Sequence, residues 1–193
     1  MAPRDDPHRR KDPFEMLEQS HRRLQEHLEL LRAAVAGLGG DGNTAAVERV
    51  REVSEFIDRS VKRHERDEEE SLFPRLTSDG DLAPILAELE GEHRHHEQLH
   101  AELRSLAEAP DAAKLQDLSR RLDDAYERHV DIEEARVFPA ARAVLDDATL
   151  ATMAQEMHAR RGRGGPGGRT GGGGGGGGGG RRRGGGGGGR GRR

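Results

Sequence analysis

HERDEEESLFP at residues 64–74 and HVDIEEARVFP at residues 129–139 align with each other without a gap. Both read His, three residues, Glu, Glu, three residues, Phe, Pro. The segments upstream match as well, since LEQSH ends at His21 and LEGEH ends at His93. The chain therefore contains an internal duplication, in which each half supplies one His followed by a His-x-x-x-Glu motif.

Helical periodicity surrounds these motifs and predicts an all-α fold. Apolar residues recur in steps of three and four along four long segments, which are separated only by short runs of helix-breaking residues. Connections this short make successive helices antiparallel neighbours, so the pattern predicts an up-down-up-down four-helix bundle. The expected helices run from Pro13 to the glycine-rich run at 37–43, from Asn43 or Thr44 to about Leu76, from about Pro84 to Ala107 and from about Asp111 to Pro139, followed by a short helix at about Asp147–Ala159.

The two Phe-Pro pairs are expected to end the helices that carry the motifs. Phe73 and Phe138 would pack into the core, and Pro74 and Pro139 would prevent continuation because proline lacks a backbone N–H.

Polar residues interrupt the inward apolar stripe of every expected long helix. Residues four apart lie one turn above each other, about 6 Å along the axis, so one His-x-x-x-Glu motif can offer two ligands to one point. A single motif of this kind is usually a solvated surface pair. On four helices at matching depth, however, the groups would cost several kcal/mol unless a multivalent cation lies between them. The residues concerned are His21, His64, Glu68, His93, His129 and Glu133.

The composition limits the chemistry of any metal site. The chain has 193 residues and no Cys, which excludes disulfides, zinc ribbons, iron–sulfur clusters and thiol nucleophiles and leaves His and carboxylate as strong ligands. The amino-terminal segment is charged and Pro-rich, and no apolar run approaches the roughly 18 residues of a membrane span. We therefore expect a soluble cytoplasmic protein that does not contact a membrane.

Charge divides the chain into an acidic body and a basic tail. Ten of the 32 basic residues lie in Arg160–Arg193, which contains no acid, so residues 1–159 hold 22 basic and 36 acidic side chains. We expect a flexible segment at 1–12, a bundle at 13–159 and a disordered Gly/Arg-rich tail at 160–193. The tail resembles Arg/Gly segments that bind RNA phosphates, although it lacks aromatic residues to stack on bases, so nucleic-acid binding through 162–193 is a minor alternative.

The doubled motif with its trailing Phe-Pro resembles the hemerythrin-like (HHE) cation-binding domains over about residues 13–159. The resemblance implies a non-haem pair of iron ions bridged by oxo and carboxylate groups, with manganese less favoured. It also implies ligands at His21, His64, His93 and His129, and bridging carboxylates at Glu68 and Glu133.

The sequence departs from the oxygen-carrying hemerythrins at two positions. Those proteins have an extra His one turn after the third-helix ligand, where this chain has Glu97, and a final bridging Asp one position after Glu133. Glu97 is therefore predicted as a seventh ligand, with Glu65, His96 and His100 as alternatives. The neighbouring Glu69 and Glu134 are interpreted as part of a solvated acidic face.

These features predict a protein that binds or senses O2, NO or peroxide, or handles iron under oxidative stress. They do not decide whether it is an enzyme, although peroxide decomposition is one activity that such a centre could support. A ferritin-like di-iron oxidase or iron store is an alternative, because Glu18 to His21 and Glu90 to His93 form Glu-x-x-His motifs. The other alternative is a metal-free helical adaptor with a buried His/Glu hydrogen-bond network and an RNA-binding tail.

Overall fold

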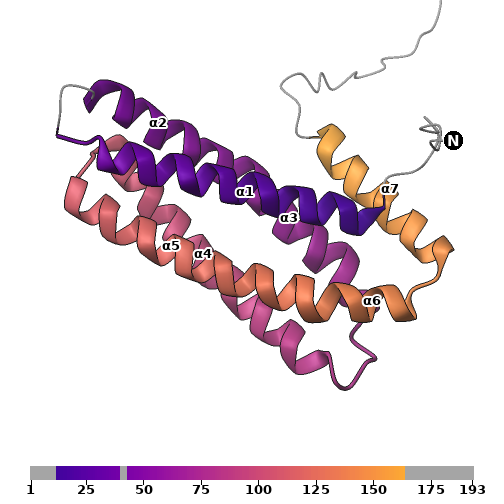
Figure 1. Cartoon of the computed structure of the whole chain (residues 1–193). Coiled ribbons are helices and arrows are strands. Elements are labelled where there is room, and N and C mark those ends of the chain that lie inside the picture. Colours follow the sequence, from indigo (N-terminus) through magenta and orange to yellow (C-terminus); the bar gives the residue numbers. More distant parts are fainter. Residues whose placement is uncertain (1–11, 40–42, 164–193) are drawn as a thin grey trace, which may run out of the picture.

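The computed structural model describes residues 12–39 and 43–163, and within these ranges it consists of helices joined by short connections (Figure 1). The helices form four arms, each a single helix or a run of directly consecutive helical segments, and two of these arms change helix type along their length. The elements are α1 (Pro13–Ala36); α2 (Asn43–Phe56), the π-helical turn η1 (Ile57–Val61), α3 (Lys62–Asp67), the π-helical turn η2 (Glu68–Leu72) and the 3₁₀ turn η3 (Phe73–Arg75); α4 (Ala83–Glu108); α5 (Ala112–Ile132), the π-helical turn η4 (Glu133–Val137) and α6 (Phe138–Val144); and α7 (Asp147–Arg163).

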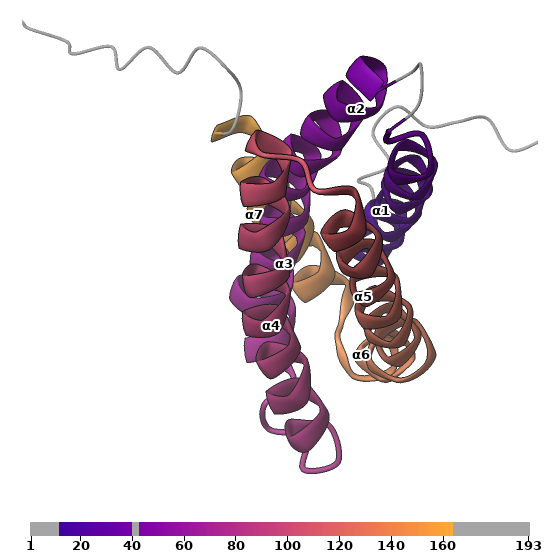
Figure 2. The same ribbon diagram turned by 90° about the vertical axis from the view of Figure 1, so that its left-hand side faces the viewer.

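The four arms form the predicted bundle, which confirms the expected fold class. α1 packs against α2 and α5, and α4 packs against the same two helices, so the arms close into a ring. α7 lies across the end of the bundle, where it contacts α1, α3 and η2 (Figures 1 and 2). None of the helices within 12–39 and 43–163 combines the length and apolar character that crossing a membrane requires.

Helix starts follow the capping residues in the sequence. The Asp12 carboxylate accepts a hydrogen bond of 2.9 Å from the backbone N–H of Phe14, and Pro13 occupies a first-turn position that needs no N–H. Asp111 caps α5 in the same way, accepting from the Lys114 N–H at 3.1 Å. These caps satisfy N–H groups that the helices themselves leave unpaired.

Three π-helical turns lie where the inward stripe advances by two consecutive steps of four residues. Examples are Val53, Ile57 and Val61 around η1, and His64, Glu68 and Leu72 around η2. Two turns of α-helix take about 7.2 residues, so an advance of eight would rotate the last residue off the buried face. The extra residue of a π turn absorbs this difference, and η2 and η4 both begin at the motif Glu of their repeat.

The expected end of the fourth arm at Pro139 is wrong, because α6 continues the helix to Val144. Just before this proline, the Phe138 N–H bonds to the Glu133 carbonyl, which is a π-type register. Where a helix returns from the π to the α hydrogen-bonding pattern, one backbone carbonyl receives no N–H from within the helix. Proline has no N–H to donate, so it is accommodated at this position. In the first repeat the arm does end after Pro74, in the short turn η3.

The last helix also runs further than expected, to Arg163 instead of Ala159. Asp67 is fully buried, and its carboxylate accepts from Arg160 Nε and Arg161 Nη1, both at 2.7 Å. This pairing compensates a buried charge and holds the end of α7 against α3. The first residues expected to belong to the tail, 160–163, thus lie in this helix, while the expectations for residues 1–11 and 164–193 fall outside the described residues.

Two apolar clusters fill the bundle, one on each side of a polar layer. Along each arm the motif residues lie between the clusters: on α1, for example, His21 separates Leu17 of one cluster from Leu24 of the other. The first cluster contains Leu24, Leu28, Leu31, Val50, Val53, Leu103, Leu115, Leu118 and Leu122, among others. The second contains Phe14, Leu17, Leu72, Phe73, Leu89, Val137, Phe138, Met153 and Met157, among others.

Candidate metal centre

Six buried side chains from the four arms converge in the polar layer. Each is at most 4% exposed, and their potential ligand atoms fall into two groups that share both carboxylates, with all atoms of a group within 4.8 Å of one another. The structure thereby brings together all six residues that the repeat singled out. They are His21 on α1, His64 on α3, Glu68 in η2, His93 on α4, His129 on α5 and Glu133 in η4.

Each carboxylate directs one oxygen to each pair of histidines. Glu68 Oε1 lies 3.3 Å from His64 Nε2, and Glu68 Oε2 lies 3.5 Å from His93 Nε2. Glu133 Oε2 lies 3.1 Å from His21 Nε2, and Glu133 Oε1 lies 3.3 Å from His129 Nε2. The arrangement therefore offers two neighbouring positions, each faced by two imidazole nitrogens and two carboxylate oxygens.

The spacing of the imidazole nitrogens fits a shared cation. His21 Nε2 and His64 Nε2 are 3.0 Å apart, and His93 Nε2 and His129 Nε2 are 3.2 Å apart. Two metal–nitrogen bonds of about 2.1 Å at a right angle would separate the two nitrogens by about 3 Å. Both separations agree with this value.

The carboxylate oxygens need a positive partner. Within the described residues, none of the four oxygens of Glu68 and Glu133 accepts a hydrogen bond of good geometry, although all are buried. Burial and the nearby Glu133 carboxylate raise the pKa of Glu68 well above its ordinary value. Burial also opposes ionisation of Glu133, but His129 and His21 outweigh it and hold the pKa of Glu133 well below its ordinary value. A multivalent cation between the two would allow both to be ionised.

Three further carboxylates orient the histidines from behind. The Nδ1–H of His21 donates to Glu134 Oε1 at 2.7 Å, and the Nδ1–H of His93 donates to Glu69 Oε1 at 2.8 Å. Such bonds fix the orientation of each ring so that Nε2 points at the centre, as in many metal sites. Interpreting Glu69 and Glu134 as merely solvated was therefore wrong. The doubled Glu-Glu in both repeats was the sequence signal for this role.

The third orienting carboxylate is Glu92, directly before His93, which accepts from His129 Nδ1 at 2.9 Å. His64 has no such partner, and its Nδ1 is buried without a hydrogen bond among the described residues. The pKa values of His64 and His129 are shifted in opposite directions. Burial and His21 hold the pKa of His64 well below its ordinary value, whereas burial of His129 is outweighed by Glu133 and Glu92, which raise its pKa to about 9.

The phenylalanines of the two Phe-Pro pairs pack on two of the central histidines, each from the other repeat. Phe138 stacks on His21 with ring centroids 5.7 Å apart, and Phe73 stacks on His93 at 6.0 Å. Each repeat therefore fixes the ring plane of the other repeat's first histidine, a contact that the sequence alone did not reveal.

Glu97 is not brought to the centre. Its side chain is 69% exposed and lies 3.8 Å from Lys62 Nζ. Residues 96 and 97 both fit one helical turn after His93, and the structure turns His96 inward instead. The structure therefore does not place Glu97 among the converging side chains.

The glutamates of the ferritin-like alternative also lie away from the centre. Glu18 is paired with Arg142 at 3.4 Å, and Glu90 is exposed. The Glu-x-x-His motifs therefore do not assemble a second set of ligands.

His96 and His100 continue the polar layer along α4 as a buried hydrogen-bonded row. His96 Nδ1 lies 3.3 Å from Glu65 Oε1, and His100 Nε2 bonds to the Tyr126 hydroxyl at 2.6 Å. The His96 ring also packs on Tyr126 and His129, with centroids 4.2 and 4.9 Å away. Burial raises the pKa of Glu65 to about 7 and lowers that of both histidines to about 3.

Replacing Tyr126 with Phe is expected to destabilise the protein by about 1–3 kcal/mol, because His100 Nε2 would stay buried without a partner. Urea denaturation of the full chain measures this change. Ser119→Ala on the same helix is the control, since the buried Ser119 hydroxyl has no partner among the described residues and its removal should cost little. Equal stability of wild type and Tyr126→Phe would contradict a structural role for this bond.

Comparison with known proteins identifies one family whose model matches this chain. The model of the hemerythrin HHE cation binding domain matches residues 12–141, which span all four arms, and matches again over residues 84–160. The second match begins near the start of α4, where the second repeat begins, in agreement with the internal duplication. No curated protein and no solved structure matches the chain.

Proposed function

The chain belongs to the hemerythrin HHE cation-binding domain family, and from this premise we propose that its core holds two iron ions bridged by Glu68 and Glu133. The observation that carries this proposal is the division of each carboxylate between two histidine pairs, at 3.1–3.5 Å. Six nitrogen and oxygen ligand groups suit iron, or less well manganese, better than zinc, which usually takes four.

The proposed ligands divide into two positions. His21 and His64 serve the first, His93 and His129 serve the second, and each position also receives one oxygen of Glu68 and one of Glu133. Glu134, Glu69 and Glu92 accept the Nδ1 protons of three histidines, which leaves Nε2 of each ring as the nitrogen that would coordinate a metal ion. The two apolar clusters exclude bulk water from both sides of the polar layer.

When bound, the iron pair supplies redox chemistry and coordination positions for a small ligand. We propose that the protein binds or senses O2, NO or peroxide, or takes part in handling iron under oxidative stress. The oxygen carriers have a further coordinating histidine one turn after the third-helix ligand. Here His96 occupies that region, but its ring packs on His129 and its Nδ1 is bonded to Glu65. This difference favours sensing or turnover over reversible oxygen carriage.

Metal analysis of protein reconstituted anaerobically with ferrous iron tests the proposal. We expect about two irons per chain and, after addition of O2, peroxide or NO, a charge-transfer absorption band. His64→Ala and His129→Ala should lose the band. His95→Ala is the matched control, because His95 is exposed on α4.

The same experiment separates the alternatives. A stable adduct with O2 would indicate carriage, and rapid loss of peroxide would indicate an enzyme. Protein that takes up neither iron nor manganese would contradict the proposal and favour the metal-free adaptor.

A further inference from the structure

The two halves of the duplication differ at one position behind the metal ligands. In the second half, Glu92 links two neighbours: it accepts from His129 Nδ1 at 2.9 Å and lies 3.3 Å from Arg128 Nη1. Arg128 directly precedes His129 in the sequence. Arginine, carboxylate and histidine thus form a closed set in which each polar group has a partner.

The first half has the arginine and the histidine without the carboxylate. Arg63 directly precedes His64, as Arg128 precedes His129, but Ser20 stands before His21 where Glu92 stands before His93. The Ser20 hydroxyl donates to the Met16 carbonyl at 3.0 Å and does not reach the histidine. His64 Nδ1 is left buried without a partner, and no ion pair of Arg63 is seen among the described residues.

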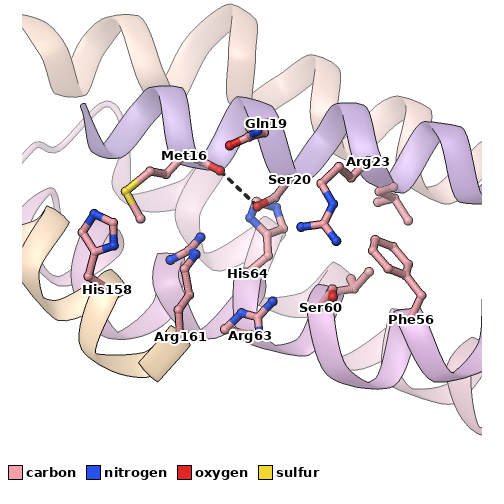
Figure 3. A pocket seen from close by; sticks show the side chains of 12 residues that line it. Met16, Gln19, Ser20, Arg23, Phe56, Ser60, Arg63, His64, His158 and Arg161 are labelled. Atoms are coloured by element: carbon pink, nitrogen blue, oxygen red, sulfur yellow. Dashed lines mark hydrogen bonds between the residues drawn. The ribbon is translucent and has the colours of Figure 1, made fainter. Parts of the chain in front are cut away.

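A cavity of about 90 Å³ occupies the space that a longer side chain at position 20 would enter. Figure 3 shows it between α1, the second arm and α7, with Ser20, Arg63 and His64 around it. Because His64 Nε2 faces the metal ligands, Nδ1, on the other side of the ring, faces away from them, and His64 lines this cavity. The volume suffices for a few water molecules or one small ion.

The charge around the cavity is positive, although the body of the protein is acidic. Arg23, Arg63 and Arg161 line it together with His158, and no carboxylate of residues 12–39 or 43–163 does. Arg161, on α7, is paired with Asp67 of α3, with Nη1 and Oδ2 2.7 Å apart. Arg23 has its guanidinium over the Phe56 ring. Among the described residues, the lining therefore offers several donors to an anion and no carboxylate to pair with Arg63.

We propose that this cavity binds a small oxyanion, which takes the place that the Glu92 carboxylate fills in the second half. One oxygen accepts from His64 Nδ1–H, and the remaining oxygens accept from Arg63 and its arginine neighbours. Charge-assisted hydrogen bonds of this kind are stronger than neutral ones. If the metal proposal above also holds, the anion would orient His64 as Glu92 orients His129, so that its concentration would adjust the first metal position alone.

Calorimetric titration of the full-length protein with acetate and, separately, with inorganic phosphate tests the site. Ionic strength is held constant, because salt screens such contacts. We expect saturable binding of at least one ion, weakened at least about tenfold by Arg63→Gln, which removes one charge-assisted hydrogen bond. Arg59→Gln is the matched control: Arg59 is on the same arm but 74% exposed and outside the cavity, and its loss should leave binding unchanged.

A second variant pair fills the cavity from within. Ser20→Glu places a carboxylate where Glu92 stands in the other half, so it should abolish binding of the added ion. Ser20→Gln has a side chain of similar size without the charge, so it should leave Arg63 and His64 without an anionic partner. In metal-free protein, the Nδ1 signal of His64 in ¹⁵N spectra should shift with acetate or phosphate in wild type, and Ser20→Glu should reproduce that shift without any ion added.

Several results would overturn the proposal: no saturable binding of either ion, equal weakening by Arg63→Gln and Arg59→Gln, or undiminished binding in Ser20→Glu. Anion binding is measured with and without metal, so its failure leaves the metal centre untouched. Conversely, a protein that takes up no iron could still bind the anion.

Discussion

Glu68→Gln and Glu133→Gln are each expected to weaken the binding of both metal ions by at least about 100-fold, because loss of a group that merely supports a ligand already costs 10–100-fold. Each carboxylate faces both histidine pairs, so removing one carboxylate removes a ligand from both positions. The measurement is metal content after dialysis against a competing chelator, followed by titration with ferrous iron.

The amide variants should still fold. Glutamine has nearly the size of glutamate but no charge, and it relieves the burial of carboxylate oxygens that accept no hydrogen bond among the described residues. Metal-free Glu68→Gln should therefore be at least as stable as metal-free wild type. Glu70→Gln is the control, since Glu70 lies in the same π turn but is 46% exposed and paired with Arg66. A variant that keeps one ion at undiminished affinity would contradict the bridging arrangement.

Removal of the metals is expected to lower the thermal midpoint of unfolding by about 10 °C or more. A ligand that binds only the folded state at 1,000 times its Kd adds about 4 kcal/mol, and each kcal/mol shifts the midpoint of a domain this size by about 2–4 °C. The physical reason is the buried pair of carboxylates: without a cation between them the pKa of Glu68 is raised, and bound metal ions would let both ionise and act as ligands. Differential scanning calorimetry with and without chelator measures the shift.

The controls for this stabilisation are variants with fewer ligands. In His64→Ala with His129→Ala, ferrous iron should leave the midpoint unchanged, and in Glu68→Gln it should raise the midpoint by less than in wild type. Magnesium should also have little effect on wild type, because it favours oxygen ligands over imidazole. Identical midpoints for the metal-loaded and metal-free protein would contradict binding of the ions in the core.

The arms of the bundle and the six central residues could be predicted because a gapless repeat and a 3.6-residue period are both visible in the sequence. The choice between His96 and Glu97 could not. Residues three and four positions after His93 deviate from its direction by similar angles, so packing decides which one turns inward. Here Tyr126 and Glu65 provide a buried hydrogen-bonded environment for His96, while Lys62 pairs with Glu97 outside.

The orienting carboxylates were harder to recognise for another reason. Glu69 and Glu134 are 42% and 45% exposed, so acidic composition alone describes them as surface residues. Their role depends on a partner in the opposite repeat, which lies 24 residues away for Glu69 and 113 for Glu134. The continuation of the helix beyond Pro139 similarly depends on the π turn before it, which local propensity does not reveal.

The division of each carboxylate between two histidine pairs has a consequence for symmetry. Neither half of the chain completes one of the two proposed metal positions by itself, since the group of His21, His64 and Glu68 also includes Glu133 from the other half. Two identical half-length chains could build the same centre as a two-fold dimer, but every substitution would then appear on both sides. A single fused polypeptide, unlike a dimer of identical chains, can carry Ser at position 20 and Glu at position 92, and so make the surroundings of its two proposed metal positions chemically unequal.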